Sequence, residues 1–189
     1  MVVAVALVLF CLRQITTPPS YPQVVPASPA AVQVAVLQGL HHAQSLQQPV
    51  ALINLDDAEA TALLRAGLAG QASLGDPQVH VLPGEVVVTG WTAILSHPLV
   101  ISGPVRLTSG GGSVVDITFI GVWVGQLGLP TPVPQLLTRV MRPRFTLPGL
   151  ASGETYSFAC FAARQNDLVL GLQSSAADPK AAQACAGAG

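Results

Sequence analysis

Short runs of β-branched and other apolar residues fill the stretch from Gln78 to Leu129. Turn-forming residues interrupt these runs about every eight to twelve positions, a spacing typical of short antiparallel strands joined by tight turns. The interruptions are Pro83-Gly84, Gly90, Ser96-His97-Pro98, Gly103-Pro104 and Gly110-Gly111-Gly112. The stretch therefore predicts an antiparallel β-meander, around which the rest of the chain must pack.

The last of these runs, Ser113 to Gly125, is apolar on more than one side. A half-buried strand alternates apolar and polar residues. Here the core-facing positions are apolar, as expected, but the opposite face also becomes apolar, at Ile120, Val122 and Val124. We therefore expect the second face of this strand to be covered by a helix, by a partner or by lipid.

Three helices are predicted around the meander. The first begins at Ser28-Pro29, where the proline occupies the first turn, and runs to about Gln48. The second begins at Asp56-Asp57 with Glu59 completing a capping box, and Gly70 marks its end. The third is an amphipathic helix over Val133 to Met141.

Further strands flank the helices. Val50 to Leu55 forms one, and the segments 155–162 and 168–172 form a closing hairpin. The fold class predicted is α+β: an antiparallel β-meander packed by two or three helices, with an N-terminal apolar segment.

Four regions are expected along the chain: an apolar signal or membrane-anchor segment (1–13), a Pro-rich linker (14–29), a single α+β domain (30–173) and a flexible Ala/Gly-rich tail (174–189). Residues Met1 to Leu12 are all apolar. A helix of that length spans about 18 Å, less than the ~30 Å of a bilayer core. Three interpretations remain: the end of a transmembrane anchor that begins upstream, an atypical secretory signal, or a short buried helix. Either of the first two places the domain outside the cytoplasm, membrane-anchored or secreted.

The composition is unusually apolar for a protein surface. Half of the residues are hydrophobic and only 9% are charged, whereas about a quarter are charged in ordinary soluble domains. Part of the surface is therefore expected to meet something apolar; the alternative is an Ala/Val-rich protein of ordinary solubility. The net charge of -1 and the lack of a basic stripe argue against nucleic acid as a partner.

The three cysteines fit no metal-binding spacing. Cys11 lies in the N-terminal apolar run, which leaves Cys160 and Cys185 as the candidate disulfide in an oxidising compartment. Such a bond would close a loop of about 24 residues and stabilise the fold by ~3 kcal/mol. The alternative is three free thiols.

No residues have the spacing of a catalytic or metal site. The chain lacks a Gly-x-Ser-x-Gly elbow, a His-Glu-x-x-His motif, a Walker loop and a G-x-G-x-x-G motif. His41 and His42 point about 100° apart on a helix, so they cannot both bind one metal unaided. His80 and His97 lie near strand ends marked by prolines and are expected to be surface histidines, and Asp56-Asp57 is expected to be a helix cap. We expect no enzymatic activity, no metal and no cofactor.

A set of apolar residues near the end of the meander is predicted to line a slot for acyl chains, each buried methylene contributing about 0.8 kcal/mol. Its members are Phe119, Ile120, Val122, Trp123, Val124, Val133, Leu136, Leu137 and Val140. Arg139, Arg142 and Arg144 would meet an anionic headgroup. The alternatives are a plain hydrophobic core for the apolar set and a solvated helix end for the arginines.

Several of these segments together resemble the LmeA-like phospholipid-binding family and the related YpmS-like anchored proteins. The likeness covers roughly Pro49 to Gln173. It is carried by Ile53 to Glu59, Leu63-Leu64, Asp76 to Val79, Pro83 to Gly90 and Val122 to Pro130. The resemblance implies an extracytoplasmic protein with an N-terminal signal or anchor. It also implies a tubular lipid-binding-like fold, in which helices lie against a curved sheet and enclose an acyl-chain cavity.

The function expected is that of a non-catalytic, membrane-tethered extracytoplasmic domain that binds a phospholipid or similar amphiphile. The alternative is a structural or accessory subunit whose apolar sheet face packs against a partner protein in a membrane complex. An enzyme acting on envelope glycans or lipids is a third, less favoured interpretation.

Overall fold

The computed structural model describes residues 13–17, 20–69, 74–94, 97–141, 144–146 and 156–174, together with Cys185. Its fold is α+β, as predicted. In chain order the elements are α2 (Pro29–Ser45), β1 (Val50–Asp56), α3 (Asp57–Gly67), β2 (Gly75–Leu82), β3 (Glu85–Ile94), β4 (His97–Gly111), β5 (Val114–Phe119), β6 (Trp123–Val124), β7 (Leu127–Gly128), α4 (Pro132–Met141), β8 (Arg144–Thr146), β9 (Tyr156–Ala163) and β10 (Asp167–Ser174). The apolar segment before residue 13 lies outside the described residues.

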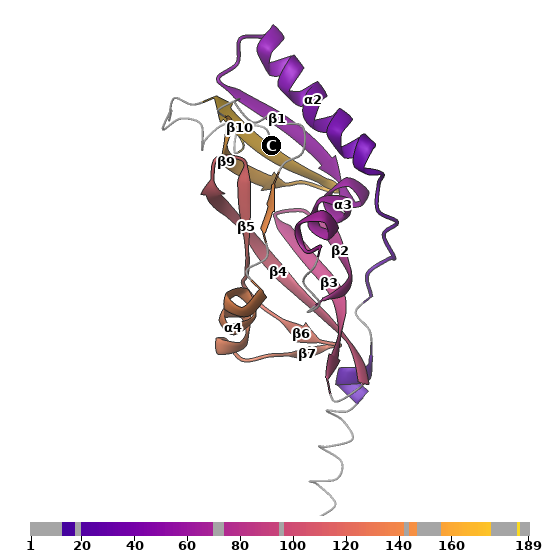
Figure 1. The fold of residues 1–189 in the computed structure, drawn as a ribbon. Helices are drawn as coiled ribbons and strands as arrows, with labels where there is room; N and C mark the ends of the chain where they lie inside the picture. The colour runs from indigo at the N-terminus through magenta and orange to yellow at the C-terminus, as the bar shows by residue number, and fades with distance from the viewer. Residues whose placement is uncertain are drawn as a thin grey trace, which may run out of the picture.

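Two antiparallel sheets are stacked end to end in an elongated molecule (Figure 1). The smaller sheet has the order β1-β10-β9, and α2 lies along β1. The larger sheet has the order β2-β3-β4-β5-β8, with the β6–β7 hairpin attached to β4. Strands β2 to β5 follow one another as hairpins, so the predicted meander is confirmed. Helix α3 lies where the two sheets meet.

The first two helices begin where the sequence predicts. The Ser28 hydroxyl accepts a hydrogen bond from the Ala31 N–H at the start of α2. Asp56 and Glu59 form the capping box of α3. Both helices end about one turn early, at Ser45 and Gly67 rather than near Gln48 and Gly70.

Two expected interruptions of the meander are wrong, because Gly90 lies inside β3 and Gly103-Pro104 inside β4. The Pro104 carbonyl accepts a hydrogen bond from the Ile120 N–H, on the side away from β3. Since the N and carbonyl of one strand residue point to the same side, the missing proline N–H removes no bond to β3. Pro104 also falls where the neighbour of β4 changes from β6 to β5, so the ladder needs no donor there.

The expected single strand from Ser113 to Gly125 is divided in two. β5 ends at Phe119, and the chain turns before β6 pairs with β4. Before this turn the odd-numbered residues Val115, Ile117 and Phe119 face the core, and after it the even-numbered residues face the core. Val122 and Val124 are therefore both buried. Helix α4 lies beside β5, and the Thr138 hydroxyl accepts a hydrogen bond from the Phe119 N–H.

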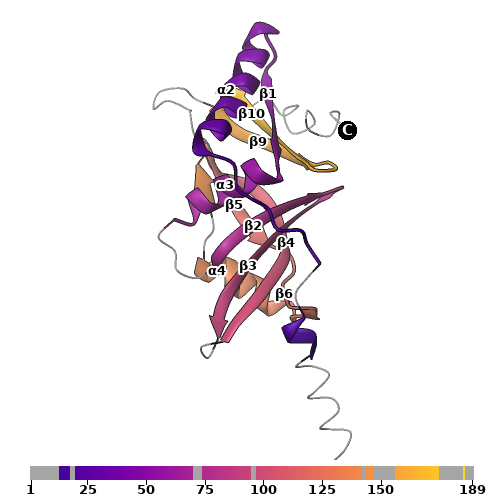
Figure 2. The same cartoon turned by 90° about the vertical axis from the view of Figure 1, so that its right-hand side faces the viewer.

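The N-terminal segment 20–28 forms neither helix nor strand, as its prolines require, but it lies along the domain. It runs upward across the face of the larger sheet to α2 (Figure 2). The Val24 N–H donates to the Gln78 side chain, and the Ala27 N–H donates to the Ala58 carbonyl. The expected linker is thus attached to the domain at several points.

One hydrophobic core spans both sheets. The space enclosed between α3 and the meander measures about 20 Å³, which is room for about one water. This part of the core is therefore filled by side chains, and the acyl-chain cavity implied by the family resemblance is not found there.

The closing hairpin, β9–β10, is present as predicted and carries the disulfide between Cys160 and Cys185. A Cβ on Gly171 of β10 would come within 2.6 Å of the Cys160 sulfur and 2.9 Å of the Cys185 sulfur. Only glycine therefore leaves room for this bond. Apart from Cys185, the expected tail after residue 174 lies outside the described residues.

Candidate functional site

The structure divides the predicted apolar set between core and surface. Phe119, Val122 and Val124 are buried, whereas Ile120 and Leu136 are 55% and 59% exposed. Trp123 is 39% exposed and Val133 is half-buried. The side chains of Leu137 and Val140 lie outside the described residues. These positions therefore do not line one slot together.

The three predicted arginines are placed differently. Arg139 is exposed on α4, while Arg144 lies in β8 opposite Asp116, with 3.6 Å between the guanidinium and the carboxylate. Both partners are well exposed, so this pair contributes little stability. Arg142 lies outside the described residues.

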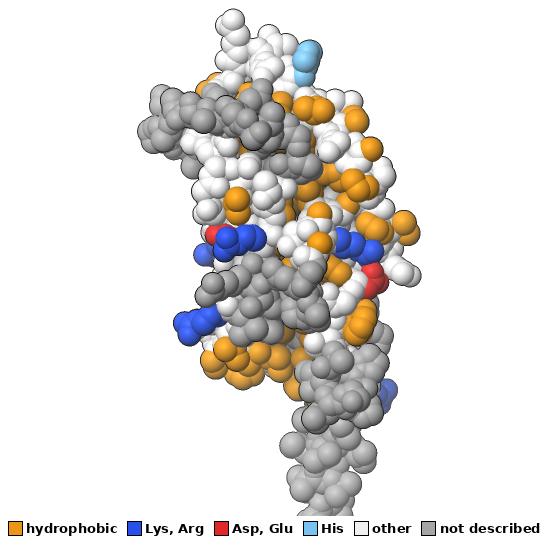
Figure 3. All heavy atoms as spheres, viewed as in Figure 1, with side chains coloured by type: hydrophobic (Ala, Val, Ile, Leu, Met, Phe, Trp, Pro, Cys, Tyr) orange, Lys and Arg blue, Asp and Glu red, His pale blue; other side chains and the backbone are white. Residues whose placement is uncertain are grey.

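The exposed apolar residues Ile120, Trp123 and Leu136 lie at the same end of the molecule as residues 13–17, where the described chain begins. We call this the hairpin end: the β6–β7 hairpin, α4 and residues 13–17. These elements lie together in both views (Figures 1 and 2). The Gln126 N–H, in the β6–β7 turn, donates to the Gln14 carbonyl at 2.8 Å. Hydrophobic side chains show at this end in the space-filling view (Figure 3).

A second feature is the outer face of the meander, the face turned away from the core. Two open hollows lie on it, one on each side of Tyr21. The Tyr21–Trp123 hollow has a volume of about 580 Å³ and is lined by Ser20, Tyr21, Glu85, Val87, Ser102, Pro104, Trp123, Gly125 and Gln126. The Trp91 hollow has a volume of about 410 Å³ and is lined by Tyr21, Gln23, Asp76, Gln78, His80, Thr89, Gly90, Trp91 and Val100.

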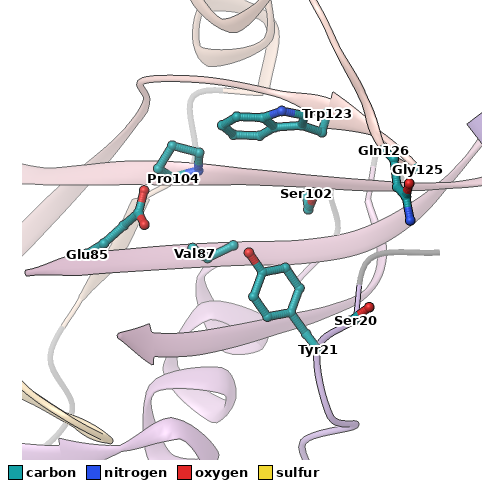
Figure 4. Close-up of a pocket in the computed structure, with 9 residues that line it drawn as sticks. All are labelled: Ser20, Tyr21, Glu85, Val87, Ser102, Pro104, Trp123, Gly125 and Gln126. Atoms are coloured by element: carbon teal, nitrogen blue, oxygen red, sulfur yellow. The ribbon is translucent and has the colours of Figure 1, made fainter. Parts of the chain in front are cut away.

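In the close-up, the rings of Tyr21 and Trp123 lie on opposite sides of a floor formed by β3 and β4 (Figure 4). Val87 and Ser102 belong to that floor, and Glu85 stands at one end of the hollow. Ser102 is only 6% exposed, and its hydroxyl has no hydrogen-bond partner within the described part of the chain. The floor thus offers an accessible hydroxyl between two aromatic rings.

His80 is buried, which contradicts its expected place on the surface. The Tyr21 ring stacks on the imidazole with 4.8 Å between ring centroids, and Nε2 lies 3.1 Å from the Thr89 hydroxyl. Nδ1 is buried without a hydrogen-bond partner. Burial lowers the pKa of His80, an effect opposed in part by the charge of Asp57. The imidazole is therefore neutral at physiological pH.

A third exposed apolar area lies on α2. Val34 and Leu37 are each 51% exposed and line a shallow hollow of about 480 Å³ together with His41 and His42. Helix α2, whose residues line this hollow, lies at the smaller-sheet end of the molecule, away from the hairpin end (Figure 1).

Within the described residues, no three His, Cys, Asp or Glu side chains gather to form a metal site. Asp56 and Asp57 have structural partners, as the cap interpretation requires: Asp56 caps α3, and Asp57 accepts from the Val81 N–H. None of the described helices has the length and apolar character needed to cross a membrane.

No protein family, curated protein or solved structure was found to match the chain. The α+β class is therefore defined by the fold itself, and the resemblance to LmeA-like proteins stays a prediction.

Sequence patterns did not identify the outer-face hollows. The signal was present in the run Val86-Val87-Val88, because consecutive valines on both faces of a strand indicate a covered second face. The structure shows the cover to be the Pro-rich segment around Tyr21, with Val87 only 3% exposed beneath it.

Proposed function

We propose that the protein is a non-catalytic, membrane-tethered extracytoplasmic domain that binds a phospholipid or similar amphiphile at its hairpin end. One observation carries the proposal. The exposed apolar side chains Ile120, Trp123 and Leu136 lie at the end where residues 14–15 contact the β6–β7 turn. The apolar sequence Met1 to Leu12 joins the domain at this end.

Physical properties of these side chains suit a bilayer surface. Trp is favoured at the membrane–water interface because its ring is apolar and its N–H is polar. Ile120 and Leu136 would lose their exposure to water by entering the acyl region. Arg13 and Arg139, both exposed, supply cations that anionic headgroups attract. Because the space beneath α3 is only about 20 Å³, the proposal places the amphiphile at the surface of the domain.

The test measures whether the hairpin end contacts lipid. The full chain with Trp91→Phe, which keeps Trp123 as its single tryptophan, is reconstituted into vesicles of brominated phosphatidylcholine with some phosphatidylglycerol. Bromine quenches tryptophan emission only at short range, so Trp123 emission should be lower than in unbrominated vesicles. Equal emission in the two kinds of vesicle would contradict the proposal.

Substitutions at this end should weaken the contact. Ile120→Glu and Leu136→Glu should each lower the docked population about tenfold, because a half-buried aliphatic contact is replaced by a charge. Arg139→Glu should reduce quenching more in anionic than in zwitterionic vesicles. The reason is that each basic side chain near an anionic surface contributes about 1 kcal/mol of attraction, which the variant loses. Leu37→Glu on α2 is the matched control, since it makes the same kind of change at a similarly exposed site far from the hairpin end. It should leave quenching unchanged.

An accessory subunit of a membrane complex is the second candidate, favoured by the exposed Val34 and Leu37 of α2. It predicts a stable protein assembly, with an interface of about 1,000 Å² or more. Mass photometry of the full chain extracted under mild conditions would then show a larger assembly that Leu37→Glu dissociates. A single-chain mass that Leu37→Glu leaves unchanged would argue against this candidate.

A further inference from the structure

Beyond the membrane proposal, with which it shares Trp123, we propose that the outer face of the meander binds a neutral oligosaccharide, whose sugar rings occupy the two hollows beside Tyr21. The inference rests on three properties of these hollows: the placement of their aromatic rings, the buried polar row on their floor, and the charges that line them.

Aromatic side chains mark both ends of this face. Trp91 in β3 pairs with Val100 of β4, and Trp123 in β6 pairs with Ser102 of β4. The two tryptophans lie on the strands either side of β4, two strand spacings apart, and their partners in β4 are two residues apart. Their backbones are therefore about 12 Å apart, a span of roughly two to three sugar rings. Trp91 is 48% exposed and Trp123 39% exposed, so both present free ring surface. Flat aromatic faces pack against the C–H face of a pyranose, as against other apolar surfaces.

The floor between the tryptophans is polar and uncharged. The pairing register aligns four residues in one row across β2, β3, β4 and β6: Gln78, Thr89, Ser102 and Trp123. Thr89 and Ser102 are 7% and 6% exposed. Thr89 contacts His80 Nε2, whereas the Ser102 hydroxyl has no partner among the described residues. The Ser102 hydroxyl is not among the buried atoms that lack a partner, so it opens onto the hollow, where a sugar hydroxyl would hydrogen-bond with it.

The lining charges argue against anionic ligands. Among the described residues, neither hollow is lined by Lys or Arg, and the charged lining residues are Glu85 and Asp76, both acidic. A phosphate or carboxylate ligand would find no cation among these lining residues, and the nearby guanidinium of Arg65 is already paired with Asp76. Carboxylates accept hydrogen bonds from sugar hydroxyls. An acyl chain would leave Ser102 buried and unpaired. A neutral polyhydroxyl ligand with apolar ring faces fits all of these groups.

The full chain itself supplies the reporter, because its two tryptophans, Trp91 and Trp123, each line one of the hollows. Cellohexaose, chitohexaose and mannohexaose are titrated while intrinsic fluorescence is recorded. We expect at least one of them to bind saturably with a Kd of about 1 mM or tighter. Inorganic phosphate and tetramethylammonium chloride serve as the anionic and cationic probes and should not bind saturably.

Variants place the site. By calorimetry, Trp123→Ala should weaken binding about tenfold and Trp123→Phe less, because phenylalanine keeps an aromatic face. Ser102→Ala removes one hydroxyl from the floor and should weaken binding roughly fivefold. Leu136→Ala, whose side chain lines neither hollow, should bind like the parent chain.

Three results would overturn the proposal. The first is that none of the three hexasaccharides binds saturably, and the second is that only tetramethylammonium or only phosphate does so. The third is glycan binding that neither Trp123→Ala nor Ser102→Ala weakens. Circular dichroism of each variant confirms that its fold is retained. Ser102→Ala should not affect quenching by brominated lipid, and Leu136→Glu should not affect glycan binding, so the two proposals fail separately.

Discussion

At the scale of single residues, one aromatic ring on the outer face contacts a buried histidine. Tyr21 stacks on His80 and lines both hollows, although 59 positions separate the two residues in the sequence. The prediction of a surface histidine was wrong because strand position alone does not reveal what covers a sheet face. The Tyr21 ring, from a distant segment, helps to bury His80 together with Thr89 and the neighbouring strand residues.

His80 therefore makes stability depend on pH. Burial lowers the pKa of His80 in the folded state below its ordinary value of 6.5. The unfolded chain then binds the proton more readily, so stability falls as pH decreases through 6.5 toward the folded-state pKa. Above 6.5 the contribution is fully present.

The measurement is the free energy of unfolding of the full chain at about pH 7.5 and about pH 5.5. The parent protein should lose more stability on acidification than His80→Gln, which keeps a hydrogen-bonding group for Thr89 but does not titrate. Comparing the two chains removes the contribution of Glu59, whose pKa is raised chiefly by burial. Identical losses in both chains would show that His80 is not the titrating group.

At the scale of elements, side chains of α3 form hydrogen bonds with the backbone groups on the free edge of β2. Asp57 accepts from the Val81 N–H and Thr61 from the Val79 N–H. Arg65 donates to the Pro77 carbonyl and also contacts Asp76. Four helix residues rise about 6 Å and two strand residues about 6.6 Å, so the two spacings match. The match holds α3 along the edge strand, which would otherwise be open to pairing with another chain.

Thr61 gives a direct test of this arrangement. Its side chain is fully buried, so Thr61→Val keeps the shape while leaving the Val79 N–H without a partner. The free energy of unfolding should fall by about 1–3 kcal/mol. Thr61→Ser, which retains the hydroxyl, should lose clearly less. If both variants lost the same amount, the methyl packing and not the hydrogen bond would be responsible.

At the scale of the whole molecule, the Cys160–Cys185 disulfide ties residue 185 to the smaller sheet. Reduction, or the double substitution of both cysteines by Ala, should lower the free energy of unfolding by about 3 kcal/mol. Urea unfolding with and without reductant measures the difference. Mass spectrometry of the unreduced protein should show that residues 160 and 185 carry no free thiols. Two free thiols there would contradict both the bond and the oxidising compartment that our proposed function requires.

The sequence by itself determined the class of fold and most of its elements. The capping signals at Ser28 and Asp56, the glycine turn after Ser109 and the helix over Val133 to Met141 all depend on neighbouring residues, and the structure confirms them. The cysteine pair could also be named as a candidate, since Cys11 lies in the apolar N-terminal run.

Only the tertiary structure decided which surfaces remain open. The predicted apolar set is split between core and surface because β5 stops at Phe119 and the chain turns before Trp123. The outer-face hollows exist because residues 20–28 cross strands that lie far away in the sequence. Local patterns record how each segment pairs with its neighbours along the chain, whereas these surfaces arise from contacts between distant segments.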